Sequence, residues 1–303
     1  MAGIIGIDIG GTWFRVGTVS PDGCLSDFRK LPVREVFRSR EPLSDLCAFL
    51  HGYVPGKELR AIAIGFPATL DKARKTVLQG PNIPFLENLP VVEVLGREFS
   101  VPVFIERDVT MALTYDAQAL QLPEEGIVCG IYFGTGVGNA IHVDGRPLLG
   151  RHGTAGELGH IPVDGVDIPC GCGNTGCMEL VAGGQQLVRL CRDLFPDTHI
   201  REVFLRHPEH PEVLRFLDRM ACAVAIEANL LDPDHILIGG GVPNMAGFPK
   251  EKLLRLILEH TRKPLPAQDL KILFTGDRED KCVLGSALYA AFRMRSVSGR
   301  ESP

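Results

Sequence analysis

The sequence predicts an α/β fold made of two similar halves, and three observations support this prediction. Apolar runs typical of β-strands alternate along the chain with segments of helical spacing, the pattern of α/β proteins with largely parallel sheets. A strand, a glycine-rich turn, a second strand and a tight turn open the chain over residues 4–23. The same series returns over residues 127–145, which indicates an internal duplication.

The first half begins with a β-branched run at residues 4–9, which leads into the turn Asp8-Ile-Gly-Gly-Thr12. A second strand at residues 14–19 ends in the turn signal Pro21-Asp-Gly23. Spacing then predicts, in order, a helix at 43–53, a strand at 61–64, a helix at 91–99, a strand at 101–105 and a helix at 109–119.

The second half repeats the opening, with strands at 127–133 and 140–143 around the glycine turn that runs from Gly134 to Gly138. The later elements expected are a helix at 213–231, a strand at 235–238, a helix at 250–260, a strand at 270–274 and a last helix at 285–296. The pattern breaks at residues 121–126. We therefore expect a smaller N-terminal domain over residues 1–120, with the last helix packed back on it, and a larger domain over residues 121–303.

Composition and charge exclude several classes of protein. A hydrophobic content of 45% and a charged content of 23% are those of a soluble globular chain. The net charge of -5 gives no support for binding to nucleic acid or to an anionic membrane. No apolar run approaches the roughly 18 residues that span a bilayer, and the first residues lack the features of a signal peptide. The nine cysteines, an odd number without regular spacing, indicate a reducing compartment, and we expect the cytoplasm.

The two glycine turns are candidates for phosphate binding. Neither is a P-loop, because the lysine of that motif is absent, and a strand rather than a helix follows each turn. Backbone N–H groups at Gly10, Gly11 and Thr12 suit phosphate oxygens, and Asp8 suits a magnesium ion held through water. The segment from Gly134 to Gly136 would clasp the same nucleotide. Each turn alone is also consistent with an ordinary tight hairpin.

A third glycine run follows the strand expected at 235–238. Gly239-Gly-Gly241 fits a backbone that a flat base approaches closely. A plain strand-to-helix turn explains the same residues equally well.

One histidine and three cysteines gather in a short stretch, and they predict a closed zinc site. Three thiolates and one imidazole, from His160, Cys170, Cys172 and Cys177, suit four-coordinate zinc. Glycines at 171, 173 and 176 would let the backbone wrap around the ion, because glycine tolerates a positive φ. With the tetrahedron filled, the flanking Glu157 and Glu179 are expected beside the ion and not on it. Such fixed carboxylates suit a substrate site.

These residues carry a family likeness over nearly the whole chain. The string Gly156-Glu-Leu-Gly-His160, followed by Cys170-x-Cys172-Gly-x-x-Gly-Cys177-x-Glu179, resembles the ROK family of sugar kinases and repressors. That family belongs to the actin-like ATPase superfamily. The resemblance therefore implies a ribonuclease H-like fold of two duplicated α/β domains with a cleft between them, and an ATP-dependent sugar kinase that requires Mg-ATP and a structural zinc ion.

The resemblance also implies a role for each matching residue. Asp108, after the strand at 101–105, matches the catalytic aspartate that accepts the proton of the attacking hydroxyl; a helix N-cap is the alternative. The implied substrate-binding residues are Ala68, Asn82, Arg107, Asp108, Glu157, His160 and Glu179. The implied ATP-binding residues are Gly6, Asp8, Gly10, Gly11, Thr12, Trp13, Gly134, Thr135, Gly136, Gly138, Gly240 and Gly241. His160, Cys170, Cys172 and Cys177 match the zinc ligands, and one nitrogen of His160 would remain for a sugar hydroxyl.

Within the family, the chain most resembles the D-allose kinases. The supporting strings are Gly65-Phe-Pro-Ala68, Pro81-Asn-Ile-Pro84 and Arg107-Asp108-Val109. Many relatives have glycine in place of Ala68 and asparagine in place of Arg107, so the chain departs from the glucose type. The resemblance implies phosphorylation of D-allose at the 6-hydroxyl in carbohydrate catabolism.

Other activities within the family stay open. Glucose, fructose, mannose and N-acetylmannosamine are alternative substrates. A sugar-responsive transcriptional repressor is a remote alternative. Such proteins carry a helix-turn-helix domain ahead of the residue that matches Asp8, and we expect none here, because only seven residues precede Asp8 and the net charge is negative. No nucleic-acid or membrane partner is expected. Relatives are often dimers, so a homodimer is expected.

Overall fold

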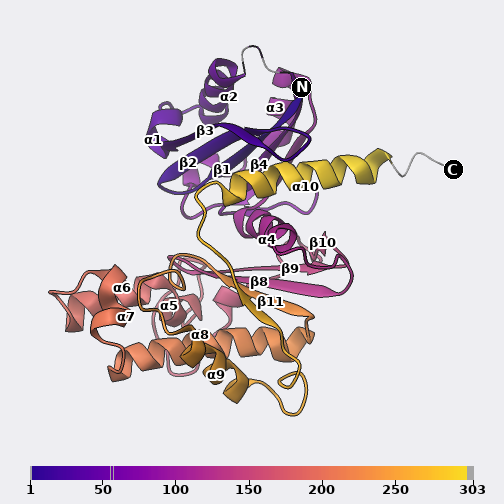
Figure 1. The fold of residues 1–303 in the computed structure, drawn as a ribbon. Coiled ribbons are helices and arrows are strands. Elements are labelled where there is room, and N and C mark those ends of the chain that lie inside the picture. The colour runs from indigo at the N-terminus through magenta and orange to yellow at the C-terminus, as the bar shows by residue number, and fades with distance from the viewer. Residues whose placement is uncertain (1, 55, 57, 299–303) are drawn as a thin grey trace. The chain divides into compact units, whose positions relative to one another are not determined.

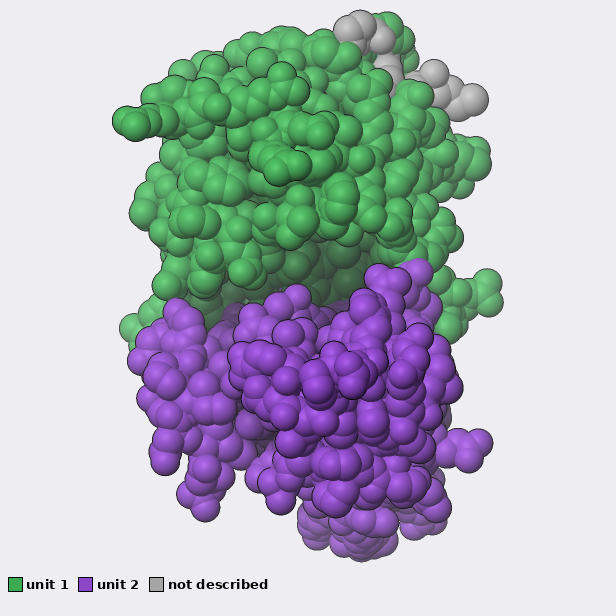
Figure 2. Space-filling model, turned by 90° about the vertical axis from the view of Figure 1, so that its left-hand side faces the viewer, with its two compact units in different colours: residues 1–122, 149–155, 278–303 green, residues 123–148, 156–277 purple. Residues whose placement is uncertain are grey.

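The computed structural model describes residues 2–54, 56 and 58–298. The chain forms two compact units, drawn in Figure 2 (green and purple). Unit 1 comprises residues 1–122, 149–155 and 278–303, and unit 2 comprises residues 123–148 and 156–277. Figure 1 labels the longer helices and many of the strands. Within the described residues, no helix is both long and apolar enough to cross a membrane.

Unit 1 is built on a five-stranded mixed sheet. Its strands are β1 (Gly3–Ile9), β2 (Trp13–Val19), β3 (Leu25–Pro32), β4 (Leu59–Phe66) and β7 (Val103–Arg107), in the order β3-β2-β1-β4-β7. The first three strands pair antiparallel, whereas β1, β4 and β7 pair parallel. A small second sheet joins β5 (Thr69–Leu70) to β6 (Val77–Gln79), ahead of the 3-10 turn η1 (Pro84–Leu86).

Helices cover both faces of this sheet. One face packs on α1 (Val33–Val36), α2 (Pro42–Tyr53) and α3 (Val91–Phe99) through a large apolar core. The other face packs on α4 (Asp108–Ala119) and α10 (Lys281–Ser298) through a smaller core of mostly small residues. Side chains alternate across a strand, so Ile5 and Ile7 of β1 enter the large core while Gly6 and Asp8 point to the opposite face.

Unit 2 repeats the same strand order on a second mixed sheet. Its strands are β8 (Ile127–Phe133), β9 (Val137–Val143), β10 (Arg146–Pro147), β11 (His235–Gly239) and β12 (Ile272–Phe274), in the order β10-β9-β8-β11-β12. The helical segments are η2 (Leu158–His160), α5 (Glu179–Ala182), α6 (Gly184–Leu194), η3 (Ile200–Glu202), α7 (Val203–Arg206), α8 (Pro211–Leu231) and α9 (Lys250–His260). The long helix α8 lies along the sheet and supplies much of the unit's core (Figure 1).

The structure confirms the α/β class and the repeated topology but corrects several details. Each sheet is mixed rather than largely parallel, because the hairpins that hold the glycine turns pair antiparallel. The last helix starts at Lys281, four residues before its expected start, and packs on β1 and α4. Strand β3 and helix α6 were not expected from the sequence. The division into domains 1–120 and 121–303 stays a prediction.

Candidate active site

The first glycine turn joins β1 to β2 in unit 1. The Gly10 N–H donates to the Trp13 carbonyl at 2.9 Å and closes the hairpin. This N–H is therefore engaged within the turn, contrary to the expectation that it would bind a phosphate oxygen. Gly11 and Thr12 are exposed and remain candidates. A Cβ atom on Gly11 would lie 3.1 Å from the carbonyl oxygen of Asn82. The fold thus places the expected sugar-binding asparagine directly against the turn that was expected to bind phosphate.

Two other residues assigned to ATP, Gly6 and Trp13, lie in strands β1 and β2 and not among the exposed residues of the turn. Gly6 is buried in the middle of β1, where a Cβ atom would come within 2.1 Å of the Val283 carbonyl oxygen of α10. Its missing side chain therefore serves helix packing. Trp13 is 39% exposed, and the Lys30 ammonium lies 4.7 Å from its ring centroid.

Asp8 is the buried carboxylate behind the turn. It faces Arg15 across the β1–β2 ladder and accepts a 2.8 Å hydrogen bond from that guanidinium. Burial raises the pKa of Asp8, and Arg15 opposes that shift only in part. A buried carboxylate with a raised pKa gains from a nearby cation, so Asp8 fits the oxygen donors that magnesium prefers.

Asp108 stands at the first position of α4, directly after β7. The N-cap is Arg107, and the Asp108 carboxylate accepts a 2.8 Å hydrogen bond from the Val109 N–H. Burial, and next the negative charge of Asp8, raise the pKa of Asp108 to about 7. A carboxyl poised near neutral pH suits a general base. Asp8 and Asp108 are therefore close enough for the charge of one to shift the pKa of the other.

A buried ionic network supports Asp108 from behind, and sequence reasoning did not find it. Glu106 is fully buried; it accepts a 2.8 Å hydrogen bond from Arg74 Nε and a 2.9 Å hydrogen bond from the Arg107 N–H. Arg74 also donates to the Gly153 carbonyl at 3.0 Å. Arg74 and Glu106 are 32 residues apart, so no local pattern predicts that they pair. The only signal in the sequence was that Glu106 is an acidic residue two positions before Asp108.

The two residues that depart from the glucose-type pattern have defined surroundings. Arg107 is buried, and its Nη2 donates to the Ala155 carbonyl at 2.7 Å. Ala68 is half-buried, and its methyl group lies 3.3 Å from the position that a Cβ atom on Gly80 would take. Ala68 thus abuts the segment that leads to Asn82, while Arg107 fixes the segment that ends at Ala155.

The second glycine turn joins β8 to β9 in unit 2. Within the turn, the Gly134 N–H donates to the Gly136 carbonyl. The start of α6 also bonds to the turn: the Gly184 N–H donates to the Gly134 carbonyl at 2.8 Å, and the Gln185 N–H donates to the Thr135 carbonyl at 3.0 Å. A Cβ atom on Gly136 would lie 2.3 Å from Oε2 of Glu179. This turn therefore also lies against a residue assigned to the sugar.

The third glycine run packs beside the second turn. Gly240 has φ +94°, and a Cβ atom there would come within 2.5 Å of the Phe133 carbonyl oxygen. Its close approach is thus to the backbone that precedes Gly134. Gly241 is exposed and keeps an open face, whereas Gly138 lies within β9 opposite Tyr132.

The histidine and three cysteines converge in unit 2. One ligand atom from each of His160, Cys170, Cys172 and Cys177 lies within 4.8 Å of all the others. The Cys172 and Cys177 sulfurs are 3.6 Å apart, and His160 Nδ1 is 3.7 Å from the Cys170 sulfur. Tetrahedral zinc with sulfur ligands needs separations of about 3.8 Å. The donor set and its spacing therefore fit zinc.

The same cluster brings both glutamates to the histidine. Nε2 of His160 lies 3.8 Å from Glu157, and Nδ1 lies 3.7 Å from Oε1 of Glu179. The Cys170 thiol also donates to Oε1 of Glu179 at 3.1 Å. With Nδ1 directed to the cysteines, Nε2 is the ring nitrogen left for a hydroxyl.

Glycines shape this cluster, although not all of those expected. Gly173 and Gly176 have φ of +96° and +76°, and a Cβ atom on Gly176 would meet the Val166 carbonyl oxygen at 2.4 Å. Gly171 does not have a positive φ, so its expected role is wrong. Gly159 lets η2 approach β9, because a Cβ atom there would lie 2.3 Å from the Val137 carbonyl oxygen.

Comparison with known proteins places these features in context. The model of the ROK family matches residues 4–292. A glucokinase from Thermotoga maritima is 27% identical over 326 residues, covering 94% of this chain and 96% of that protein. An N-acetylmannosamine kinase from Escherichia coli O157:H7 is 27% identical over 294 residues, covering 94% and 97%.

Solved structures share the fold. A ROK hexokinase from Thermus thermophilus is 26% identical with a TM-score of 0.77, covering 97% of this chain and 99% of that chain. A ROK family transcriptional regulator, a homologue of the E. coli MLC protein, is 25% identical with a TM-score of 0.80, covering 94% and 77%. The same fold thus occurs in proteins named as kinases and in one named as a regulator.

Proposed function

Because the chain belongs to the ROK family, we propose that it is an ATP-dependent sugar kinase that phosphorylates the 6-hydroxyl of a hexose. One observation carries the proposal most directly. Unit 1 buries Asp8 near Asp108 and raises the pKa of Asp108 to about 7, while Asn82 lies against the exposed phosphate turn at Gly11. A base, a cation-binding carboxylate and a turn of backbone N–H groups are what phosphoryl transfer requires of a protein.

Asp108 accepts the proton of the attacking hydroxyl in this proposal. A positioned base contributes about 10²–10⁴-fold to the rate, and its pKa works best near the operating pH. Asp8 would hold magnesium, which neutralises charge on the β- and γ-phosphates when bound. The Glu106–Arg74 pair keeps Asp108 in place, because the Glu106 carboxylate also accepts a hydrogen bond from the N–H of Arg107, the residue directly before Asp108.

Unit 2 supplies the other residues assigned to recognition, besides Ala68, Asn82 and Arg107 of unit 1. Glu157, Glu179 and Nε2 of His160 are assigned to sugar hydroxyls. His160, Cys170, Cys172 and Cys177 would hold a structural zinc ion that fixes the histidine ring. Thr135 and Gly136 are assigned to ATP phosphates, with Gly241 beside them for the nucleoside.

D-Allose is the substrate that we propose within the hexose class. The support is the pair of departures from the glucose type. The Ala68 methyl group narrows the space beside the Gly80–Asn82 segment, and Arg107 braces the backbone at Ala155. A methyl group in a pocket shifts selectivity by about 1–3 kcal/mol, and a mismatched hydroxyl by more.

A coupled ADP-release assay across aldohexoses, fructose and N-acetylhexosamines tests both levels of the proposal. We expect the highest kcat/KM with D-allose. A higher value for glucose, mannose, fructose or N-acetylmannosamine would overturn the allose assignment and keep the kinase. Sugar binding without ADP release, together with a gel shift on DNA, would instead support a regulator.

We further propose a homodimer in the cytoplasm. Light scattering of the purified chain tests the homodimer, since a mass near 33.0 kDa would contradict it.

The free cysteines support the cytoplasmic location, because none of the described thiols is paired in a disulfide.

A further inference from the structure

A second cluster of metal-ligating side chains lies in unit 2, outside the residues assigned to sugar and ATP. Asp218 and Cys222 on α8, together with His260 on α9, place one ligand atom each within 4.8 Å of the others. Nε2 of His260 lies 2.7 Å from Oδ1 of Asp218. The spacing of four residues puts Asp218 and Cys222 on one face of α8, toward the C-terminal end of α9.

The two helices hold this cluster on a firm frame. Leu253 and Ile257 of α9 are fully buried in the core to which α8 also belongs. Asn229 of α8 fastens the end of α9 at two points: its amide donates to the His260 carbonyl at 3.3 Å, and its Oδ1 accepts from the Arg262 N–H at 2.8 Å. The backbone of His260 is therefore tied to the helix that carries the other two ligands.

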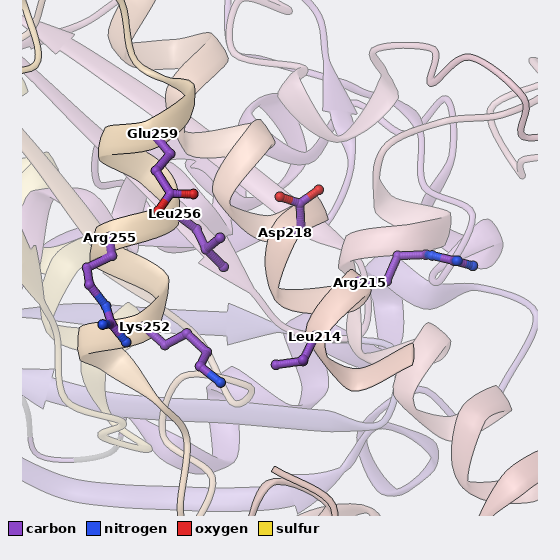
Figure 3. Close-up of a pocket in the computed structure, with 7 residues that line it drawn as sticks. All are labelled: Leu214, Arg215, Asp218, Lys252, Arg255, Leu256 and Glu259. Carbon is purple, nitrogen blue, oxygen red and sulfur yellow. The ribbon is translucent and has the colours of Figure 1, made fainter. Parts of the chain in front are cut away.

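The surroundings keep one side of the cluster open. Asp218 lies at the edge of a groove between α8 and α9, with a volume of about 500 Å³. Figure 3 shows Asp218 and Glu259 on opposite helices, with Leu256 between them. Two of the cations that line the groove are engaged elsewhere, Arg215 with Glu212 and Lys252 with Glu209. The side chains of His260 and Asp218 are 36% and 39% exposed, so solvent reaches this side of the cluster.

We propose that Asp218, Cys222 and His260 form a three-ligand site for a borderline divalent transition-metal ion such as zinc. A thiolate and an imidazole exclude calcium and magnesium as the preferred ions, and three protein ligands plus water are typical of an open zinc site. Binding replaces the Asp218–His260 hydrogen bond by two metal bonds. Nε2 of His260 donates the proton of that hydrogen bond, so the ring proton moves to Nδ1 when the metal binds, and the Cys222 thiol proton passes to solvent. The two ligand atoms then separate from 2.7 Å to about 3.4 Å. The ion would join α8 to α9.

Zinc titration of the purified chain, which keeps the first cluster intact, tests this site. We expect about one zinc ion per chain beyond those bound at purification, with weaker affinity than a four-ligand site. Cys222→Ser and His260→Gln should each weaken this additional binding at least about tenfold. Cys191→Ser, which alters a buried thiol on α6 outside both clusters, is the matched control and should bind as the unaltered chain does.

Cobalt supplies a readout that does not depend on kinase activity. Co²⁺ in the site should give a thiolate charge-transfer band that disappears in Cys222→Ser and persists in Cys191→Ser. Far-UV circular dichroism and the metal-free Tm verify that each variant is folded. No additional ion, or additional binding that is unchanged in both Cys222→Ser and His260→Gln, would overturn the proposal. Sugar phosphorylation should be unchanged in these variants, so the site and the kinase assignment fail separately.

Discussion

The two glycine turns occupy the same place in two copies of one topology, yet their surroundings differ. In unit 1 the turn lies against the backbone of Asn82 and in front of the buried Asp8. In unit 2 the turn lies against the flexible end of Glu179, whose other carboxylate oxygen contacts the Cys170 thiol. The duplicated frame therefore carries carboxylates with raised pKa values in one unit and a cysteine cluster in the other.

The difference assigns separate tasks to the two turns. Burial without a full counter-charge suits Asp8 to the proposed binding of a cation and Asp108 to the proposed acceptance of a proton. Both roles belong to the phosphoryl-transfer step. A carboxylate fixed beside a metal cluster suits recognition of hydroxyl groups. We therefore expect changes at Asp8 or Asp108 to lower kcat, and changes around Glu179 to raise the KM for the sugar.

The largest effect is expected for Asp108→Asn. Removing the base should lower kcat about 10²–10⁴-fold while sugar binding, measured by calorimetry, changes little. Glu93→Gln, which alters an exposed carboxylate of the same unit, is the control. If the variant keeps more than about a tenth of the rate, Asp108 is not the base. If the variant loses sugar binding instead, the division of tasks between the turns is wrong.

Arg74→Met should give the next largest effect, on stability. The change leaves Glu106 buried without its partner, and breaking such a pair costs about 3–5 kcal/mol. Chemical denaturation measures this loss. Arg97→Met, which breaks the exposed Arg97–Glu93 pair, should cost less than about 1 kcal/mol.

A double variant sharpens the test of this network. Arg74→Met combined with Glu106→Leu should recover stability relative to Arg74→Met, because the double variant no longer leaves the charge of Glu106 buried without Arg74. Its kcat should fall below that of the unaltered chain, since the hydrogen bond that the Arg107 N–H donates to Glu106 is lost. Full recovery of kcat would show that the pair does not position Asp108.

Cys172→Ala tests the assignment of recognition to unit 2. Freshly purified protein should contain about one tightly held zinc ion per chain, and the variant should lose it. The KM for the sugar should rise at least about tenfold, while the KM for ATP changes less. Cys24→Ala, at an exposed thiol of unit 1, should change neither. Active, freshly purified protein without zinc would refute the structural ion.

The limits of sequence reasoning follow from where the signals lie. The helices Val91–Phe99 and Lys250–His260 and the strand Ile127–Phe133 have the predicted bounds, because apolar periodicity is a local signal. Strand β3 was missed because it lies at the edge of its sheet and carries Asp27, Arg29 and Lys30 among few apolar residues.

Long-range contacts explain what the local patterns did not show in the site. Gly6 is required by a helix that begins at residue 281, and Arg74 meets Glu106 across 32 residues. The cysteine cluster was predicted as a set, because its four ligands lie within 18 consecutive residues. The positive φ expected of its glycines is found at Gly173 and Gly176 and not at Gly171.

The raised pKa of Asp108 also predicts a pH-dependent stability. Its folded pKa is about 7, against an ordinary value of 3.8, so the folded state holds the proton more tightly than the unfolded chain. This carboxyl therefore weakens the folded state as pH rises from about 4 to about 7. Asp108→Asn should raise Tm by a few degrees, roughly 2–6 °C, at pH 8 and not at pH 4. An equal gain at both pH values would contradict the shifted pKa.

The finest test compares alanine at one position of each turn. In Gly136→Ala the new methyl group overlaps Oε2 of Glu179, the movable end of a side chain, so the carboxylate shifts and the fold is little disturbed. The KM for the sugar should rise roughly 3–10-fold, or about 1 kcal/mol, with little change in Tm. In Gly11→Ala the contact is 3.1 Å to the Asn82 carbonyl oxygen, which needs a shift of only a few tenths of an ångström. In Gly11→Ala the KM for the sugar should therefore rise about twofold or less.

Gly134→Ala is the matched control for this pair. No described atom lies within 4 Å of the position that its methyl group would take, so the sugar KM should not change although the turn is the same. Glu179→Gln should abolish the difference between Gly136→Ala and the unaltered turn, because both changes act through one carboxylate. If Gly134→Ala raised the sugar KM as much as Gly136→Ala does, the second turn would act on the sugar through its backbone and not through Glu179. The contrast between the two turns would then rest on the buried aspartates alone.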